Sequence, residues 1–224
     1  MFTGIVEGLG EIRRITPRNQ SYELAIDIGE LVEGARIGDS IAVDGTCLTV
    51  TRIARSEVCF DVITETIALT SFSARKVGDK VNIERSMAAN GRFHGHIVAG
   101  HVDGTGRLVR RVQSPGQTAL TFEIGETLAR QCITKGSIGI DGVSLTLTEV
   151  TATTISVALI PHTLAITSLG FRREGDVVNI EVDQMGKWVR RILSAFVDEV
   201  PPPEGEGRAP GGLVTPDDLG KYFG

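Results

Sequence analysis

The stretch SIAVDGTCLTVT at residues 40–51 returns as SIGIDGVSLTLT at residues 137–148. A second pair follows, because KVGDKVNIE at 76–84 returns as REGDVVNIE at 173–181 with the same displacement of 97 residues. A period this long indicates a duplicated domain and not a solenoid, whose repeating units are far shorter. We therefore expect two halves that share one fold.

The duplication begins close to the N-terminus. TGIVEGLGEI at residues 3–12 matches AGHVDGTGRL at 99–108, displaced by 96, so a single insertion separates this pair from the later ones. The chain has 224 residues, which leaves room for two compact units of roughly 100 residues each. We predict two tandem domains.

Each half is rich in Val, Ile and Thr in short runs separated by Gly-rich turns, a pattern typical of strands. The pairs Asp44-Gly45 and Asp141-Gly142 favour tight turns, because glycine tolerates positive φ without steric cost. Many short strands around such turns predict an all-β fold of two small antiparallel barrels. In the first half we expect strands at 5–14, 22–28, 40–53, 57–63 and 80–84, with matching runs in the second half, and short helices at 64–72 and 161–169.

The repeated strand has two different faces. Side chains alternate across a strand, so the apolar and the polar residues of each copy separate. We expect the apolar rows, Leu48 and Val50 in one copy and Val143, Leu145 and Leu147 in the other, to fill the barrels. The other rows, Cys47, Thr49 and Thr51 and then Ser144, Thr146 and Thr148, then lie outside. They suit the close approach of a flat heterocycle that needs hydrogen-bond partners, although threonine is also a common exposed strand residue.

Composition narrows the kind of partner. Hydrophobic residues make up 41% of the chain and charged residues 23%, as in an ordinary globular protein. The net charge of −5 and the aromatic content of 5% argue against a nucleic-acid-binding pair of barrels, which needs clustered positive charge and stacking surfaces. No window approaches the ~18 consecutive apolar residues of a membrane span. Three cysteines without metal-type spacing indicate reduced thiols and a cytoplasmic location, and we expect a small-molecule ligand.

The last part of the chain has no counterpart in the first half. Between 183 and 200 the apolar residues recur at three- and four-residue steps, which predicts a helix with one apolar stripe: Met185, Trp188, Val189, Ile192, Phe196 and Val200. This stripe can pack on its own barrel or on the same helix of other subunits. The Pro- and Gly-rich segment 201–224 then predicts a disordered tail.

Differences between the two copies mark the places where equivalent sites would acquire different tasks. Cys47 aligns with Ser144, Ile5 with His101, and Ser86 with Asp183. A thiol becomes a strong nucleophile near neutral pH, whereas an isolated serine hydroxyl does not ionise usefully there, and an imidazole exchanges protons at physiological pH. Each residue also has a plain structural interpretation, as a strand filler, a turn residue or a helix cap.

The segment FHGHIVAGHVDG at 93–104 raises the question of a metal site. His94, His96, His101 and Asp103 are all possible ligands. The intervening glycines can equally serve tight turns and a close approach of the backbone to a ligand. We favour the second interpretation and expect no metal.

Several motifs together resemble the riboflavin synthase alpha chain. They are MFTGIVEG at the N-terminus, GTCLTVT, GHIVAGHVDG, KGSIGIDGVSLTLTEV and VNIEVD, in order and along almost the whole chain to about Val200. The resemblance implies two tandem six-stranded Greek-key barrels and a C-terminal helix that assembles a homotrimer. We accordingly place a first lumazine-binding barrel at 1–96, a second at 97–184, a trimerisation helix at 185–200 and the tail at 201–224.

The resemblance also implies a reaction, the final step of riboflavin biosynthesis. Two molecules of 6,7-dimethyl-8-ribityllumazine exchange a four-carbon unit to give riboflavin and 5-amino-6-ribitylamino-2,4-pyrimidinedione, without cofactor or metal. In such proteins the reaction centre forms between the first barrel of one subunit and the second barrel of a neighbour. Association with lumazine synthase is a further possibility, and a non-catalytic lumazine- or flavin-binding protein on the same fold is the alternative function.

By motif, the resemblance assigns residues to each half. The first-half site would use Gly4, Ile5, Val6, Cys47, Leu48, Thr49, Asp61, Val62, Ile63, Thr64, Glu65 and Thr66. The second-half site would use Gly100, His101, Val102, Lys135, Ser144, Leu145, Thr146, Ala158, Leu159, Ile160, Pro161, His162 and Thr163. For the chemistry we select Ser40, Cys47, His101 and Asp183, with Phe2 as an organising contact. One lumazine must lose a proton from its C7 methyl group, and we expect His101 to help move protons, while the identity of the base or nucleophile and a hydride route stay open.

Overall fold

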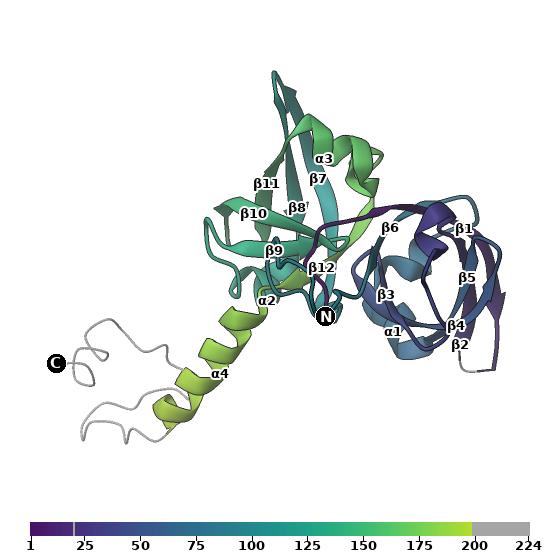
Figure 1. Cartoon of the computed structure of the whole chain (residues 1–224). Coiled ribbons are helices and arrows are strands. Elements are labelled where there is room, and N and C mark those ends of the chain that lie inside the picture. The colour runs from purple at the N-terminus through teal and green to yellow at the C-terminus, as the bar shows by residue number, and fades with distance from the viewer. Residues whose placement is uncertain (20, 199–224) are drawn as a thin grey trace, which may run out of the picture. The chain divides into compact units, whose positions relative to one another are not determined.

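Two closed barrels form the body of the protein. The computed structural model describes residues 1–19 and 21–198, and its first compact unit, Met1–Gln184, contains both barrels (Figure 1). Each barrel has six antiparallel strands, so the predicted fold class is confirmed. The second compact unit begins at Met185.

The two barrels have the same strand order. The first closes as β1-β2-β5-β4-β3-β6 and the second as β7-β8-β11-β10-β9-β12, which is the same connectivity shifted by six strands. In the first barrel the elements are β1 (Gly8–Pro17), β2 (Ser21–Asp27), η1 (Gly29–Val32), β3 (Ser40–Val43), β4 (Thr46–Ala54), β5 (Glu57–Ile63), α1 (Thr64–Leu69), η2 (Ser71–Ala74) and β6 (Lys80–Arg85). In the second they are β7 (Gly104–Ser114), β8 (Gln117–Glu123), α2 (Gly125–Ala129), β9 (Ser137–Ile140), β10 (Val143–Val150), β11 (Thr154–Leu159), α3 (Pro161–Ile166), η3 (Ser168–Gly170) and β12 (Val177–Val182).

The alternation read from the repeated strand is confirmed. Leu48 and Val50 are buried in the first core, whereas Thr49 and Thr51 are exposed and Cys47 is half-buried. In the second copy Val143 and Leu147 are buried and Leu145 packs against the same core, while Thr146 and Thr148 are exposed. The period of two therefore places the apolar rows inside the barrels and the small polar rows outside.

Two expected strand boundaries change. The predicted strand 40–53 is a hairpin of β3 and β4, because Asp44 (φ 43°) and Gly45 (φ 77°) both take left-handed conformations in the turn between them. Two such residues in sequence match the right-handed twist of the flanking strands. The predicted strand 5–14 begins at Gly8 instead, because Val6 packs into the core of the second barrel.

The barrels meet at their two Asp-Gly turns. A Cβ on Gly45 would lie 2.6 Å from the backbone nitrogen of Gly142, and a Cβ on Gly142 would lie 2.7 Å from that of Gly45. Real Cβ atoms do not approach backbone this closely, so both positions require glycine at this junction. The sequence motif that predicts a hairpin turn thus also brings the two halves into contact.

A buried ion cluster surrounds these turns. Asp44 and Asp141 are fully buried, and Arg75 and Arg172 each donate hydrogen bonds to both carboxylates at 2.8–3.4 Å. Burial, and after it the neighbouring Asp141, raises the pKa of Asp44 to about 6, although both arginines oppose that shift. The cluster therefore places two buried carboxyl groups against two guanidinium groups.

Asparagine side chains complete the junction. The Nδ2 of Asn82 donates to the backbone carbonyl of Asp141, and the Nδ2 of Asn179 donates to that of Asp44, both at 2.8 Å. The Oδ1 atoms of the same residues accept from Ser168 N and Ser71 N, respectively, so each amide joins one barrel to the other. Asn82 and Asn179 occupy equivalent places in the NIE motifs, so each copy of the repeat contributes the same interface residue.

The C-terminal helix is α4 (Gln184–Asp198). Apolar side chains along it are exposed: Met185, Trp188, Val189, Ile192 and Leu193. The helix begins one residue before the predicted 185–200, whereas the side chain of Phe196, residues 199–200 and the tail 201–224 lie outside the described residues. Among the residues that the structure describes, no helix has the length and apolarity to cross a membrane.

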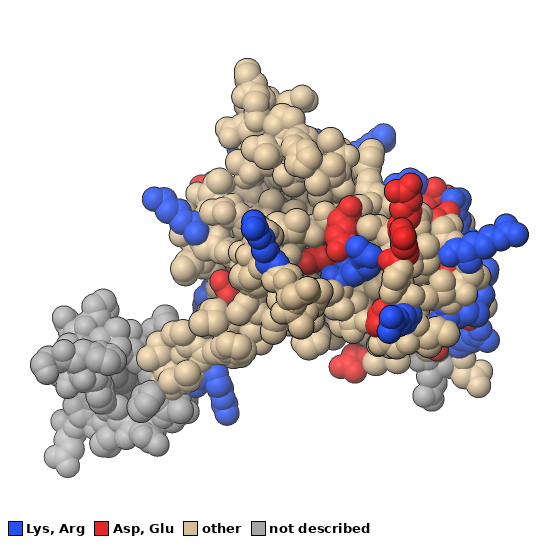
Figure 2. Space-filling model, viewed as in Figure 1, with Lys and Arg blue, Asp and Glu red and all other residues tan. Residues whose placement is uncertain are grey.

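Charge is unevenly distributed on the face shown in Figure 2. Acidic and basic side chains lie interspersed over the first barrel, whereas the part of the second barrel around β7, β8 and α3 is largely uncharged in this view. On this face no basic stripe of the kind that tracks a phosphate backbone is visible (Figure 2).

Candidate functional site

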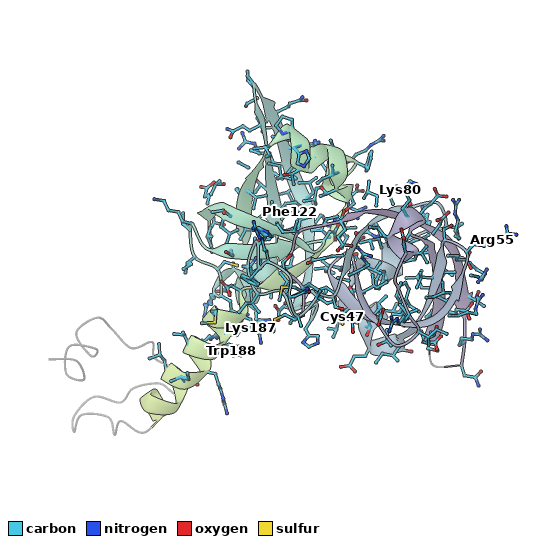
Figure 3. All side chains as sticks on the ribbon, in the orientation of Figure 1. Cys47, Arg55, Lys80, Phe122, Lys187 and Trp188 are labelled. Carbon is cyan, nitrogen blue, oxygen red and sulfur yellow. The ribbon has the colours of Figure 1, made fainter. Side chains whose placement is uncertain are left out.

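The outer face of the β3–β4 hairpin presents small polar groups. Ser40 pairs with Thr49 and Ala42 pairs with Cys47 across the hairpin, so all four side chains share the outer face. Figure 3 labels Cys47, which lies on the side of the first barrel toward the second. Two of the four residues selected for chemistry, Ser40 and Cys47, are thus brought onto one surface.

The β9–β10 hairpin repeats this surface in the second barrel. Ser144 pairs with Gly139 and Thr146 pairs with Ser137. Lys135, which precedes this hairpin, is exposed and has φ 67°, where its counterpart in the first half is Gly38 with φ 95°. A left-handed lysine is uncommon, and such strained residues concentrate at ligand-binding sites.

The segments that follow β5 and β11 border these hairpins. Val50 lies opposite Phe60, so in this antiparallel pair the end of β5 runs beside the beginning of β4. In residues 61–66 the side chain of Val62 is buried, those of Asp61, Ile63, Thr64 and Glu65 are exposed, and that of Thr66 is half-buried. Residues 158–163 repeat this pattern at the end of β11, with Leu159 buried, Ala158, Ile160, Pro161 and His162 exposed, and Thr163 half-buried.

The N-terminal loop of the chain belongs to the second barrel's surface. The carbonyl oxygen of Gly4 accepts a hydrogen bond of 2.8 Å from the backbone amide of Ser144. Val6 is part of the second barrel's hydrophobic core, and Ile5 between them is 49% exposed. Residues 4–6 therefore lie beside Ser144 and not beside Cys47.

The equivalent loop of the second half makes the reciprocal contact. The carbonyl oxygen of Gly100 accepts a hydrogen bond of 2.9 Å from the backbone amide of Cys47. His101 follows and is exposed, and Val102 is half-buried. By motif, each loop is grouped with the hairpin of its own half, whereas the structure joins each loop to the hairpin of the other barrel.

Phe2 holds the two loops together. Its amide donates to the carbonyl of Val98 at 2.8 Å, and the amide of Val98 donates back to Phe2 at 3.2 Å. The Phe2 side chain is fully buried in a small cluster with Ala42 and Val98, against which Cys47 packs. Phe2 therefore contacts both the 98–100 segment and the hairpin of the first barrel, and its organising role stays a prediction.

Two carboxylates fix the backbone of the crossing loops. Glu84 accepts from the amides of Thr3 at 2.6 Å and Gly4 at 3.0 Å, and also from the Thr3 hydroxyl at 2.8 Å. In the second half Glu181 accepts from the amides of Ala99 at 2.7 Å and Gly100 at 3.0 Å. Burial raises the pKa of Glu84, although these hydrogen bonds oppose the shift. Each loop is therefore held by a carboxylate of its own barrel and delivered to the hairpin of the other.

The hydroxyl group of Ser144 contacts a side chain that is distant in the sequence. The Nδ1 atom of His96 lies 2.7 Å from Ser144 Oγ. Burial lowers the pKa of His96, and the negative charge of Asp183 acts in the opposite direction. Asp183, half-buried directly after β12, is thereby connected to the second-barrel surface.

The possible metal ligands do not form a cluster. Of the residues in FHGHIVAGHVDG, His94 is exposed, whereas His96 is buried against Ser144, and the carboxylate of Asp103 accepts from the amide of Val182. Within residues 1–19 and 21–198, no group of three or more His, Cys, Asp or Glu side chains is placed to hold a metal ion. The side chain of His96 instead contacts a serine hydroxyl, and that of Asp103 accepts from the backbone.

Comparison with known proteins identifies the family. The lumazine binding domain matches residues 3–86 and again 99–183. Riboflavin synthase of Bacillus subtilis is 42% identical over 86% of this chain and 90% of its own length, and that of Actinobacillus pleuropneumoniae is 41% identical over the same shares. The chain belongs to the riboflavin synthase family. Its two lumazine binding domains coincide with the two copies of the repeat.

Solved structures with the same fold hold flavin-type ligands. LumP in complex with riboflavin has a TM-score of 0.76 and 29% identity to this riboflavin synthase family member. The alignment covers 81% of this chain and 99% of the LumP chain. LumP in complex with 6,7-dimethyl-8-(1'-D-ribityl) lumazine has a TM-score of 0.74 at 27% identity with the same coverage. The barrel pair is therefore shared with a protein that binds the ring system expected for this family.

Sequence reasoning missed three residues that shape the candidate site of this riboflavin synthase family member: Glu84, Glu181 and His96. Glu84 and Glu181 stand in VNIE motifs, whose alternation predicts only a strand; the presence of a glutamate at the same place in both halves is the signal that points to a shared role. His96 was considered solely as a metal ligand. Its contact with Ser144 joins segments far apart in the chain, and no local pattern reports such a contact.

Proposed function

We propose that this chain is itself a riboflavin synthase. It joins two molecules of 6,7-dimethyl-8-ribityllumazine and transfers a four-carbon unit from one to the other, which yields riboflavin and 5-amino-6-ribitylamino-2,4-pyrimidinedione. The two products together contain all the atoms of the two substrates, so the reaction needs no oxidant or water. The observation that supports this most directly is the pair of matching surfaces, because a reaction between two identical molecules requires two similar binding sites.

Each surface binds one lumazine. At the first barrel the ligand contacts Cys47–Thr49, the segment 61–66 and the crossing loop 100–102. At the second it contacts Ser144–Thr146, Lys135, the segment 158–163 and the crossing loop 4–6. The crossed hydrogen bonds of Gly4 and Gly100 support this arrangement, since they bring each loop onto the hairpin that it completes. Backbone amides and carbonyls of the loops and strand ends read the polar edge of the pyrimidine ring, and the hydroxyl and thiol groups contact the reacting edge.

The reactive groups are divided between the two surfaces. Ser40, Cys47 and His101 act at the first barrel and Asp183 at the second, and no cofactor or metal takes part. Because stacked and aligned reactants gain ~7–11 kcal/mol over free encounter, a large part of the rate comes from holding the two rings together. The exposed apolar side of α4 supports a homotrimer, in which the first barrel of one subunit meets the second barrel of a neighbour. The enzyme acts in the cytoplasm and is a candidate partner of lumazine synthase.

The experiment that tests the function mixes the purified full-length chain with 6,7-dimethyl-8-ribityllumazine and a chelator, without cofactor. We expect riboflavin and the pyrimidinedione to form in equal amounts over many turnovers. Binding of the lumazine without turnover would instead support the alternative of a non-catalytic ligand-binding protein on the same barrels, as the likeness to LumP allows. If the chain neither binds the lumazine nor converts it, both functions are contradicted.

A further inference from the structure

His96 is buried within the second-barrel surface. It is 8% exposed, and its Nδ1 lies 2.7 Å from Ser144 Oγ. Its backbone is fixed as well, because its amide donates to the carbonyl of Thr3 at 3.2 Å. A Cβ on the preceding Gly95 would lie 2.2 Å from that same carbonyl, so a larger residue at position 95 would clash with the backbone of Thr3.

The second ring nitrogen of His96 has an unusual environment. Among the described residues, the buried Nε2 atom of His96 is without a hydrogen-bond partner. Buried polar atoms in native proteins are almost always paired, and exceptions concentrate where function requires them. The histidine leaves one ring nitrogen unpaired, which costs stability. We therefore look for its function in the other interaction of the ring, the contact with Ser144.

The protonation state of the ring suits a proton acceptor. Burial favours the neutral imidazole, which has one nitrogen with a free electron pair. When Nδ1 is that nitrogen, it accepts the hydrogen bond from the Ser144 hydroxyl. Asp183 favours the protonated ring, so its charge stabilises the imidazolium that forms once the serine proton has moved. In enzymes with an activated hydroxyl group, the hydroxyl lies within hydrogen-bond reach of a base, and an acidic group interacts with that base. Ser144, His96 and Asp183 have these three chemical characters.

The comparison of the two halves explains why the second surface needs this base. Cys47 stands where Ser144 stands in the other copy, and both donate their backbone amides to a crossing loop. A thiol ionises near ~8.5 without assistance, whereas a serine hydroxyl does not ionise near neutral pH. Replacing the thiol by a hydroxyl therefore requires a neighbouring proton acceptor, and the imidazole of His96 supplies one.

We propose that His96 is a positioning residue that relays a proton from the second-barrel ligand through Ser144. In this step the C–H bond of the lumazine C7 methyl group breaks and its electron pair enters the ring. The proton is taken by Ser144 Oγ, whose own proton passes to His96 Nδ1, and the reverse transfer regenerates both residues. The proposal rests on the proposed function, since the lumazine at this surface is the proton donor.

The test uses variants that separate hydrogen bonding from proton transfer. In His96→Asn an amide takes the place of Nδ1, so a hydrogen bond to Ser144 can form but no proton can be accepted. We expect kcat for riboflavin formation to fall by ~10²-fold, a typical contribution of a proton-transfer group, while the dissociation constant for riboflavin changes by less than about threefold. His94→Asn, an exposed histidine two residues away, is the matched control and should retain the activity of the wild type.

Coupling to Ser144 distinguishes a relay from a structural role. In the double variant Ser144→Ala, His96→Asn, the activity should equal that of Ser144→Ala alone, because both changes interrupt one path. In a Ser144→Cys background, His96→Asn should cost less than it does with serine, because a thiol needs less assistance. Multiplied effects in the double variant, or a His96→Asn enzyme with kcat within twofold of the wild type, would overturn the relay.

A second measurement keeps the proposal testable if turnover fails. Exchange of the C7 methyl hydrogens with D₂O, followed by NMR at saturating protein and corrected for the rate in buffer, reports proton removal without the four-carbon transfer. We expect acceleration by the wild type and loss of that acceleration in His96→Asn. If the wild type accelerates exchange but forms no riboflavin, the proposed function fails and the relay stands. Equal exchange rates in the wild type and His96→Asn would contradict the relay itself.

Discussion

Gly4 and Ser144 are in direct contact across the two barrels: the carbonyl of Gly4 accepts the amide proton of Ser144 at 2.8 Å, and a Cβ on Gly4 would lie 2.6 Å from the Cβ of Ser144. Gly100 has the same relationship to Cys47, also with 2.6 Å between the two Cβ positions. These two contacts complete the two surfaces that we propose bind the ligands.

Gly4→Ala and Gly100→Ala should therefore damage the surfaces that the two loops complete. Both glycines have positive φ, 76° and 80°, so alanine adds backbone strain of roughly 1–2 kcal/mol as well as the overlap. We expect kcat/KM for riboflavin formation to fall at least ~10-fold in each variant. Gly116→Ala is the control, because Gly116 has φ 81° but open space around its Cβ position. If all three variants lose activity equally, strain and not the crossing contact is responsible.

Replacing the carboxylates that hold the loops should loosen them without removing any group that touches the ligand. In Glu84→Gln and Glu181→Gln an amide nitrogen faces a backbone N–H, so one hydrogen bond of each pair is lost along with the charge, at a cost of ~1–3 kcal/mol. We expect weaker riboflavin binding measured by fluorescence titration. Glu126→Gln, an exposed glutamate, should bind like the wild type. Unchanged binding in Glu84→Gln would contradict a role in positioning the loop.

The junction between the barrels should make stability depend on pH. The pKa of Asp44 is raised from 3.8 to about 6, so between these values the folded state holds a proton that the unfolded state has released. The contribution of Asp44 to the free energy of unfolding therefore decreases as pH rises from about 4 to about 6, by roughly 3 kcal/mol in total, and is constant above that window.

Urea unfolding of the wild type and Asp44→Asn at several pH values between 4 and 7 measures this contribution. The wild type should lose stability relative to Asp44→Asn as pH rises through the window, because the asparagine does not titrate. A difference between the two proteins that stays constant with pH would show that Asp44 keeps its ordinary pKa in the junction.

The thiol of Cys47 can be tested by the smallest available change. Cys47→Ser keeps the backbone hydrogen bond to Gly100 and nearly the same shape, but replaces an ionisable thiol by a hydroxyl. If the thiol takes part in the chemistry, kcat should fall by about tenfold or more while riboflavin binding is retained. Cys132→Ser, a half-buried position outside both surfaces, serves as the control. Full activity of Cys47→Ser would rule out an essential thiol.

The apolar side of α4 should control assembly. Trp188 and Ile192 are 51% and 58% exposed one turn apart, and burying such residues between subunits stabilises an oligomer by ~1.5–3 kcal/mol per side chain. We expect Ile192→Glu to shift a trimer toward monomers in light scattering, whereas Arg191→Glu, on a neighbouring exposed position, should leave it intact. If the wild type is a monomer, or if Ile192→Glu remains trimeric, the helix is not the assembly element.

Much of the fold follows from local patterns. The strand predicted at 57–63 has the observed bounds of β5, and the alternation of Leu48 and Val50 with Cys47 and Thr49 gives the correct inner and outer faces. These features depend on side-chain periodicity and turn chemistry within a few residues, which a sequence displays directly. The errors occur where distant segments compete for the same residues, as at Gly8, where β1 begins late because the preceding loop is bound by the other barrel.

Three features can be read from the amino-acid sequence of this protein without coordinates: the duplication of one β-rich unit, the buried faces of its strands, and the motifs that resemble one family. Each is a pattern of residue types along the chain, so no knowledge of the packing is needed to detect it. Three other features follow from the three-dimensional fold and not from any sequence pattern: the exchange of the loops between the barrels, their hydrogen bonds to Glu84 and Glu181, and the contact of His96 with Ser144. Hydrogen bonds of this kind depend on where two whole barrels dock, and that docking is set by the buried junction around Asp44 and Asp141 and not by any local pattern.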